Sequence, residues 1–318
     1  DINDPEGEIS LCTLSAVNWG AIKSLDSMAN VCDLAVRALD ELLDYQEYPV
    51  EAARRSTMNR RPLGIGIINF AYWMAKNDMT YTQPDLEMID EYAEAWSYYL
   101  IKASADLAEE QGACLWSNET KYSKGLTPNQ TYKQDVDELV PHKERMPWRE
   151  LRDQLKLTGI RNSTLMALMP AETSAQISNA TNGIEPPRSL VSVKQSKHGV
   201  LKQVEPSIHK LKNKYELLWD QRSPEGYLQI MAVLQKYIDQ GISVNTSYNP
   251  VFYDDEKISM SEMLRHLMIF YKYGGKQLYY FNTYDGQGEL DIDKLTESTN
   301  ITVPETEIEE EDCESCVI

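Results

Sequence analysis

The chain has 318 residues, of which 42% are hydrophobic and 25% charged, and its formal net charge is −19 at pH 7. This length and composition are typical of a globular protein with a full hydrophobic core. The large negative charge repels nucleic-acid phosphates and anionic membrane surfaces, so we expect neither as a partner. No apolar run reaches membrane-spanning length and the first residues lack a signal-peptide pattern, so we expect a cytoplasmic protein.

The cysteines do not suggest a structural disulfide framework, because no secretion signal accompanies them. The five are Cys12, Cys32, Cys114, Cys313 and Cys316. Cys32 falls on the apolar stripe of a predicted helix and is interpreted as a core thiol. The four histidines stand apart, with no second ligand at metal spacing, so we expect no metal site in this chain.

Hydrophobic periodicity in the first half of the chain predicts a strand at residues 8–17 and an amphipathic helix at 24–44. Residues 60–67 predict a short strand that leads directly into a helix. A second long helix is predicted at 86–111, and the polar segment 117–150 predicts irregular connections and short helices.

The second half predicts three further strands, at 162–169, 241–245 and 276–283. It also predicts three helices, at 171–176, 227–239 and 261–273. Alternation of strands and helices indicates an α/β fold with parallel strands. We therefore expect one α/β unit over residues 1–283, followed by a flexible acidic tail over 284–318.

The tail carries a pair of cysteines near its end. It is acidic and poor in large apolar residues, which predicts disorder. Cys313 and Cys316 have the spacing that suits reversible disulfide formation. From Thr283 to Cys313 the chain spans roughly 30 Å on average and about 100 Å when fully extended. Half a zinc site and a chance pair are the alternatives, but the tail offers no further zinc ligand, so a redox shuttle is favoured.

The start of the predicted helix at 171–176 is a candidate anion site. Its free N–H groups and dipole favour negative charge, and Thr173 and Ser174 add hydroxyl groups. Ala171 adds only its backbone, and Glu172 would repel a phosphate unless its carboxylate points away. On these residues alone, an ordinary capped helix is the favoured interpretation.

Tyr279 and Tyr280 are adjacent in the last predicted strand. Adjacent tyrosines in a strand usually indicate half-buried β packing. In a regular strand their side chains face opposite sides. Joint use of both phenols would therefore need the strand to end or twist at this point.

Several segments together resemble the large, catalytic subunit of class I ribonucleotide reductase. Their order and spacing fit that family and cover nearly the whole chain, so the joint match is specific although no single segment is. The segments are LCTLSAVN at 11–18, LGIGIINFAY at 63–72, EEQGAC at 109–114, RNST at 161–164, PAETS at 170–174, SNATNGIEPP at 178–187, LYY at 278–280 with NT at 282–283, and the tail ending in two cysteines.

The resemblance implies a fold and a set of site residues. The family fold is a ten-stranded α/β barrel, and residues 1–283 resemble its second, five-stranded parallel half with additional helices. Cys12 corresponds to one of two reducing thiols. Tyr279 and Tyr280 correspond to a tyrosine pair that relays a radical from the small subunit. Residues 171–174 correspond to the site that holds the substrate phosphates, which reverses the interpretation from those residues alone.

The tail dithiol, Cys313 and Cys316, corresponds to the pair that re-reduces the active-site disulfide and is itself reduced by thioredoxin or glutaredoxin. Gly275 departs from the family pattern, and we expect it to loosen the start of the tyrosine strand.

The implied reaction is the reduction of ribonucleoside diphosphates to deoxyribonucleotides by a radical mechanism. This chain is expected to hold no cofactor, and the partner small subunit is expected to carry a di-iron/tyrosyl radical centre. The family's thiyl cysteine and first half-barrel correspond to sequence upstream of Asp1. We therefore expect the C-terminal portion of a split or truncated subunit, inactive alone and completed by an N-terminal catalytic-subunit chain. The alternative is a non-catalytic docking or regulatory module that binds the small subunit.

Overall fold

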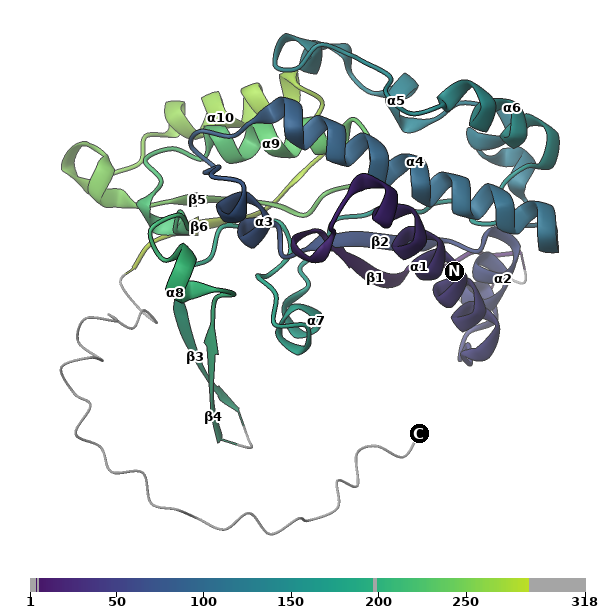
Figure 1. The fold of residues 1–318 in the computed structure, drawn as a ribbon, viewed down its shortest axis with the longest axis horizontal. Helices are drawn as coiled ribbons and strands as arrows, with labels where there is room; N and C mark the ends of the chain where they lie inside the picture. Colours follow the sequence, from purple (N-terminus) through teal and green to yellow (C-terminus); the bar gives the residue numbers. More distant parts are fainter. Residues whose placement is uncertain (1–3, 5, 197–198, 286–318) are drawn as a thin grey trace.

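The computed structural model describes residue 4, residues 6–196 and residues 199–285. Helices α4, α9 and α10 lie along one side of the parallel strands, while α7 and the β3–β4 hairpin project from the other side (Figure 1). The helices are α1 (Leu25–Tyr45), α2 (Glu51–Arg60), α3 (Phe70–Lys76), α4 (Leu86–Gln111), α5 (Pro128–Thr131), α6 (Trp148–Thr158), α7 (Glu172–Ile177), α8 (Ile208–Leu211), α9 (Glu225–Gln235) and α10 (Met260–Lys272).

The strands form two parallel pairs and one hairpin. β1 (Thr13–Asn18) pairs with β2 (Leu63–Ile68), and β5 (Val244–Tyr248) pairs with β6 (Leu278–Thr283). The hairpin joins β3 (Val191–Ser196) to β4 (Gly199–Val204). The α/β class with parallel strands is confirmed, and the described residues show three two-stranded sheets without a closed barrel.

An extended segment at 164–168 lies between the two parallel pairs. Single parallel bridges join Met166 to Ile65 of β2, and Leu168 to Ile242 just before β5. The strand predicted at 162–169 is thus present only as isolated parallel bridges over 164–168, because a side chain takes part of the backbone ladder. The Asp239 carboxylate accepts the N–H groups of Leu165, at 2.8 Å, and Met166, at 2.9 Å.

The strand predicted at 8–17 begins later, at Thr13. The register that pairs Thr13 with Leu63 would pair Cys12 with Pro62. Proline has no N–H to donate to a ladder, so the pairing cannot extend in that direction. Cys12 therefore lies just outside β1.

Periodicity predicted the long helices well, and α1, α4, α9 and α10 are confirmed to within a few residues. The interpretation of Cys32 as a core thiol is also confirmed, since it is fully buried on α1. Among the described elements, the helices α2, α6 and α8 and the β3–β4 hairpin were not predicted. The hairpin did carry a signal, the alternation Val191-Ser192-Val193 and the glycine at 199.

Charged side chains are buried where α4 meets α9. On α4, Asp90 and Glu94 both accept hydrogen bonds from Arg145, at 2.8 and 2.9 Å. The ammonium group of Lys236 lies 3.1 Å from Asp90, and the Tyr237 hydroxyl donates to the same carboxylate at 2.8 Å. Buried charges persist only when paired in this way, so the network fixes α4 against the C-terminal end of α9.

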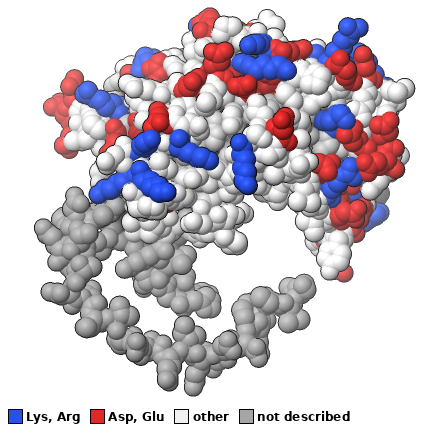
Figure 2. Space-filling model, in the orientation of Figure 1, with Lys and Arg blue, Asp and Glu red and all other residues white. Residues whose placement is uncertain are grey.

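Acidic and basic side chains are interspersed over the face shown in Figure 2. The negative charge is therefore not gathered into one patch on this face. Within the described part of the chain, no helix combines the length and the apolar character needed to cross a membrane.

Gly275 leaves room for a core side chain just before β6, and the loosening of β6 expected from it stays a prediction. A Cβ at this position would lie 2.3 Å from the ring of Phe270, which is 2% exposed. We predict that Gly275→Ala lowers the free energy of unfolding by about 1–3 kcal/mol, as overpacked cores do.

Urea unfolding followed by circular dichroism measures this effect. Gly241→Ala is the matched control, because its Cβ would meet only Gln277, at an ordinary 3.6 Å. Equal stabilities for the two variants would show that Phe270 moves aside freely.

Candidate functional site

Tyr279 and Tyr280 lie in a bulge of β6. Val244 pairs with Leu278, whereas Thr246 pairs with Phe281. One residue of β5, Asn245, therefore stands opposite two residues of β6, which are the two tyrosines. Such a two-against-one arrangement bends the strand and re-aims its side chains.

The bulge brings the two tyrosine rings together. Their centroids are 4.3 Å apart with planes inclined at 57°. A regular strand would place them on opposite faces. The bulge is therefore the departure from a regular strand that joint use of both phenols needs. A hydrogen bond with Tyr280 raises the pKa of Tyr279. Both side chains are about half exposed and available to a partner.

Cys12 is held at the amino end of β1 by contacts from distant segments. Its thiol donates to Oε1 of Gln240 at 3.8 Å. The Gln240 amide in turn donates to the backbone carbonyls of Leu63, at 2.8 Å, and Met166, at 3.3 Å. Gly64 makes space for the sulfur, because a Cβ there would lie 2.4 Å from it.

The Cys12 thiol is protonated at neutral pH. Although the residue as a whole is exposed, burial of the sulfur, and then the charge of Asp239, raise the pKa of Cys12 to about 11. A thiol in this state is a hydrogen donor rather than a nucleophile.

The high pKa gives a testable reactivity. In a Cys313→Ser/Cys316→Ser background, Cys12 should react with iodoacetamide at pH 8 about tenfold or more slowly than a free thiol. Its rate should continue to rise with pH beyond pH 9, where a free thiol levels off. Mass spectrometry of the alkylated peptide over a pH series measures this, and a plateau near pH 8.5 would contradict it.

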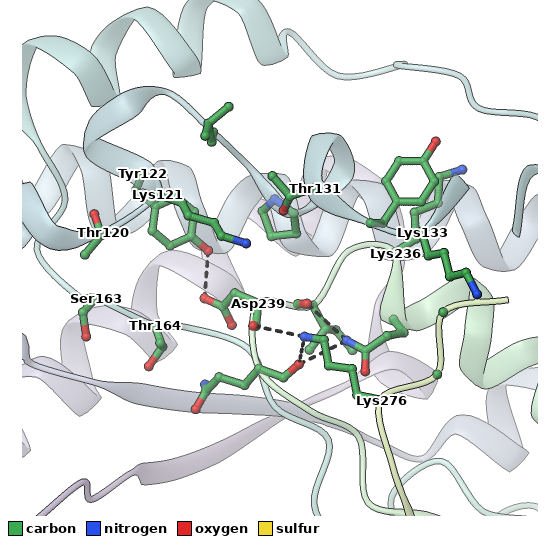
Figure 3. A pocket seen from close by; sticks show the side chains of 18 of the residues that line it. Thr120, Lys121, Tyr122, Thr131, Lys133, Ser163, Thr164, Lys236, Asp239 and Lys276 are labelled. Carbon is green, nitrogen blue, oxygen red and sulfur yellow. Dashed lines mark hydrogen bonds between the residues drawn. The ribbon is translucent and has the colours of Figure 1, made fainter. Parts of the chain in front are cut away.

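A cavity of about 740 Å³ lies beside Gln240, the hydrogen-bond partner of Cys12. Asp239 and Gln240 line it, together with Tyr122, Lys121 and Lys276 (Figure 3). The Tyr122 hydroxyl donates to Asp239 at 2.8 Å, and the Lys276 ammonium group donates to the backbone carbonyls of Asp239 and Gln240. Burial raises the pKa of Asp239 and lowers that of Lys276.

The start of α7 lies at the opposite end of the strands from Cys12. Ala171 and Ala175 belong to a small apolar cluster that includes Ile68, the last residue of β2. Ala171 is the N-cap and supplies no side-chain cap, and its own N–H donates to Asn182 at 3.1 Å. The structure therefore pairs the tyrosines but leaves Cys12 and residues 171–174 at opposite ends of β1.

Comparison with known proteins identifies the family. A family model described as the ribonucleotide reductase barrel domain matches residues 2–281, which is most of the chain. The chain belongs to this family.

Individual relatives agree with the ribonucleotide reductase assignment. The chain is 54% identical to the ribonucleoside-diphosphate reductase subunit alpha of Haemophilus influenzae, over 92% of this chain and 39% of the relative. It is 51% identical to the ribonucleoside-diphosphate reductase 1 subunit alpha of Escherichia coli, over 79% of this chain and 33% of that relative. The phage T4 subunit alpha is 40% identical over 99% of this chain and 41% of its own length. The chain thus spans between a third and about two fifths of the length of these relatives.

Two predicted site residues, Cys313 and Cys316, lie outside the described residues, as does nearly all of the segment 284–318. Among the residues that are described, no group of three histidine, cysteine or acidic side chains could hold a metal ion.

The sequence held no sign of the side chains that position the predicted site residues. Asn245 is the last residue of the predicted strand at 241–245, and Asp239 and Gln240 directly precede that strand, but no pattern marked them. Their hydrogen-bond partners lie 35 or more residues away along the chain, so local periodicity carries no trace of them.

Proposed function

We propose that this chain is part of the catalytic subunit of a class I ribonucleoside-diphosphate reductase, which reduces ribonucleotides to deoxyribonucleotides by a radical mechanism. The observation that carries the proposal is the contact between the rings of Tyr279 and Tyr280, whose centroids are 4.3 Å apart because the bulge turns both side chains to the same side of β6. A phenol can lose an electron and a proton together, so two touching phenols can pass an oxidising equivalent without a stable charge. Family membership and the names of the relatives support the same reaction.

The architecture proposed is half of a barrel. Five parallel extended segments lie side by side in this order: β1, β2, residues 164–168, β5 with the preceding Ile242, and β6. Parallel bridges join each segment to the next. A second set of strands from the rest of the catalytic subunit would close the barrel. The radical-bearing thiol would come from that part.

Cys12 would supply one of two reducing thiols. Reduction of a ribose 2′-carbon removes the hydroxyl as water, and two thiols supply the two hydrogens and become a disulfide. Cys12, protonated at neutral pH, suits the donor role. Cys32 and Cys114 are buried, so the second thiol would come from the rest of the catalytic subunit, in the first half of the barrel.

Residues 171–174 would hold the substrate phosphates through the backbone N–H groups at the start of α7. Thr173 and Ser174 would add hydroxyl donors, while Ala171 contributes backbone alone. The carboxylate of Glu172 would have to point away from the phosphates.

The proposed partners follow from the electron flow. The tail dithiol Cys313–Cys316 would reduce the disulfide formed by Cys12, and thioredoxin or glutaredoxin would reduce the tail. A small subunit with a di-iron/tyrosyl radical centre would supply the oxidising equivalent to the tyrosine pair.

The test is an assay of deoxyribonucleoside diphosphate formation. This chain would be combined with the remaining catalytic-subunit sequence, as a separate chain or within one polypeptide, and with the small subunit and a dithiol. We expect product from the complete mixture and none from this chain alone. A correctly assembled and reduced mixture that forms no product would favour the docking or regulatory module.

A further inference from the structure

We infer that Asn245 and Glu185 form a positioning pair that holds the tyrosine bulge in the conformation required for radical relay. The inference deepens the proposed function and rests on it for its relevance to catalysis. Its structural part concerns only residues of this chain and can be tested without turnover.

Asn245 occupies the position in β5 that faces the bulge. A bulge leaves an extra residue without its ladder partner. Here the side chain of Asn245 replaces that partner, because its Oδ1 accepts the backbone N–H of Tyr280 at 3.0 Å. Asn245 thus binds the backbone of Tyr280 and leaves its phenol to interact with Tyr279.

Glu185 fixes the orientation of the asparagine amide. The Nδ2 group of Asn245 donates to Oε1 of Glu185 at 2.5 Å, a short distance for a bond to a carboxylate oxygen. An amide turned the other way would set Oδ1 against the carboxylate and an N–H against the Tyr280 N–H. Only one orientation satisfies both neighbours, so the carboxylate selects the acceptor that the bulge needs.

The backbone around Glu185 is itself anchored. The hydroxyl of Tyr81, which is 2% exposed, donates to the carbonyl of Ile184 at 2.9 Å. Pro186 and Pro187 follow and restrict the chain on the other side. The carboxylate is therefore presented from a fixed turn.

Without Asn245 and Glu185, β6 can pair with β5 in a regular register that has no bulge. A β6 without the bulge would shift by one residue relative to β5 and place Tyr279 and Tyr280 on opposite faces. The ring contact would then be lost even if the chain stayed folded. Asn245 and Glu185 are thus positioning residues, which act on the relay through the backbone of Tyr280.

The variants change the donor and acceptor groups of Asn245 and Glu185 one at a time and then together. Asn245→Ala removes both hydrogen bonds. Asn245→Asp keeps an acceptor for Tyr280 but sets a carboxylate against Glu185. The double variant Asn245→Asp/Glu185→Gln restores a donor and acceptor with reversed polarity. Ser247→Ala is the matched control, since it removes a longer β5–β6 contact, 3.4 Å to Asn282, outside the bulge.

The readout is the fluorine–proton Overhauser effect between 3-fluorotyrosine at position 279 and the ring of Tyr280. We expect a strong effect in the unmodified chain, in Ser247→Ala and in the double variant. We expect at least a fivefold loss in Asn245→Ala and Asn245→Asp, with circular dichroism unchanged. In the complete enzyme, kcat should fall at least tenfold in these two variants at constant KM for the nucleotide and recover in the double variant.

The outcomes separate the inference from the function. An undiminished Overhauser effect in Asn245→Ala overturns the inference, whatever the activity. Loss of the effect with rescue by the double variant supports the pair. If the effect is lost while turnover stays unchanged, the pair holds the bulge and the relay function proposed for the tyrosines is what fails.

Discussion

Replacing Tyr279 or Tyr280 by phenylalanine will stop deoxyribonucleotide formation by the complete enzyme. Phenylalanine keeps the ring and its packing but lacks the O–H group from which an electron and a proton can be removed. We expect turnover to fall by about a thousandfold or more, the scale seen when a residue that takes part in the chemistry is lost. Product formation with a radiolabelled nucleoside diphosphate measures this.

The fold should not change in these variants, because both rings are about half exposed and neither belongs to the core. Tyr45→Phe is the control, since that tyrosine is 86% exposed and lies on α1, outside the pair. Normal assembly together with turnover in either position-279 or position-280 variant would remove that residue from the radical path.

Lys236→Met will cause the largest loss of stability. The lysine side chain is 1% exposed, and its ammonium group lies 3.1 Å from Asp90, which is fully buried. Removing one partner of a buried ion pair costs about 3–5 kcal/mol, because a charge is left without compensation. Asp90 keeps its bond to Arg145, so we expect about 3 kcal/mol, at the lower end of that range.

Urea unfolding at pH 7 measures the effect. Asp90→Asn/Lys236→Met should recover part of the loss, because the fully buried carboxylate is then gone, while Asp137, 3.6 Å from the Lys236 ammonium group, is partly exposed to water. Lys102→Met is the control, since Lys102 pairs with Asp106 at the surface and such pairs contribute less than about 1 kcal/mol. Equal losses for Lys236→Met and Lys102→Met would show that water reaches Asp90.

Hydrophobic periodicity over consecutive residues was enough to place the long helices. The apolar stripes of α1 and α10 and the glycine that ends α4 are properties of consecutive residues, and these helices were placed well. The segment 162–169 forms only isolated bridges instead of a full strand, because Asp239, some seventy residues later, takes two of its N–H groups. No periodicity over a short window contains that information.

For the candidate site, the sequence likewise predicted which residues matter but not how they are arranged. The tyrosines and Cys12 were found from the sequence and its family resemblance. Their geometry was not, because the bulge depends on Asn245, which is 35 residues from Tyr280, and the thiol depends on Gln240, which is 228 residues from Cys12. A regular strand, the default expectation, would have separated the phenols that the bulge brings together.

The most direct measurement is electron paramagnetic resonance of the complete enzyme with an easily oxidised tyrosine analogue, such as 3-aminotyrosine, at position 280. If the pair relays the radical, adding nucleotide substrate will produce an analogue radical and consume the small-subunit radical at the same rate. A small-subunit radical that stays unchanged, with no analogue signal in an assembled and substrate-bound enzyme, would contradict the account.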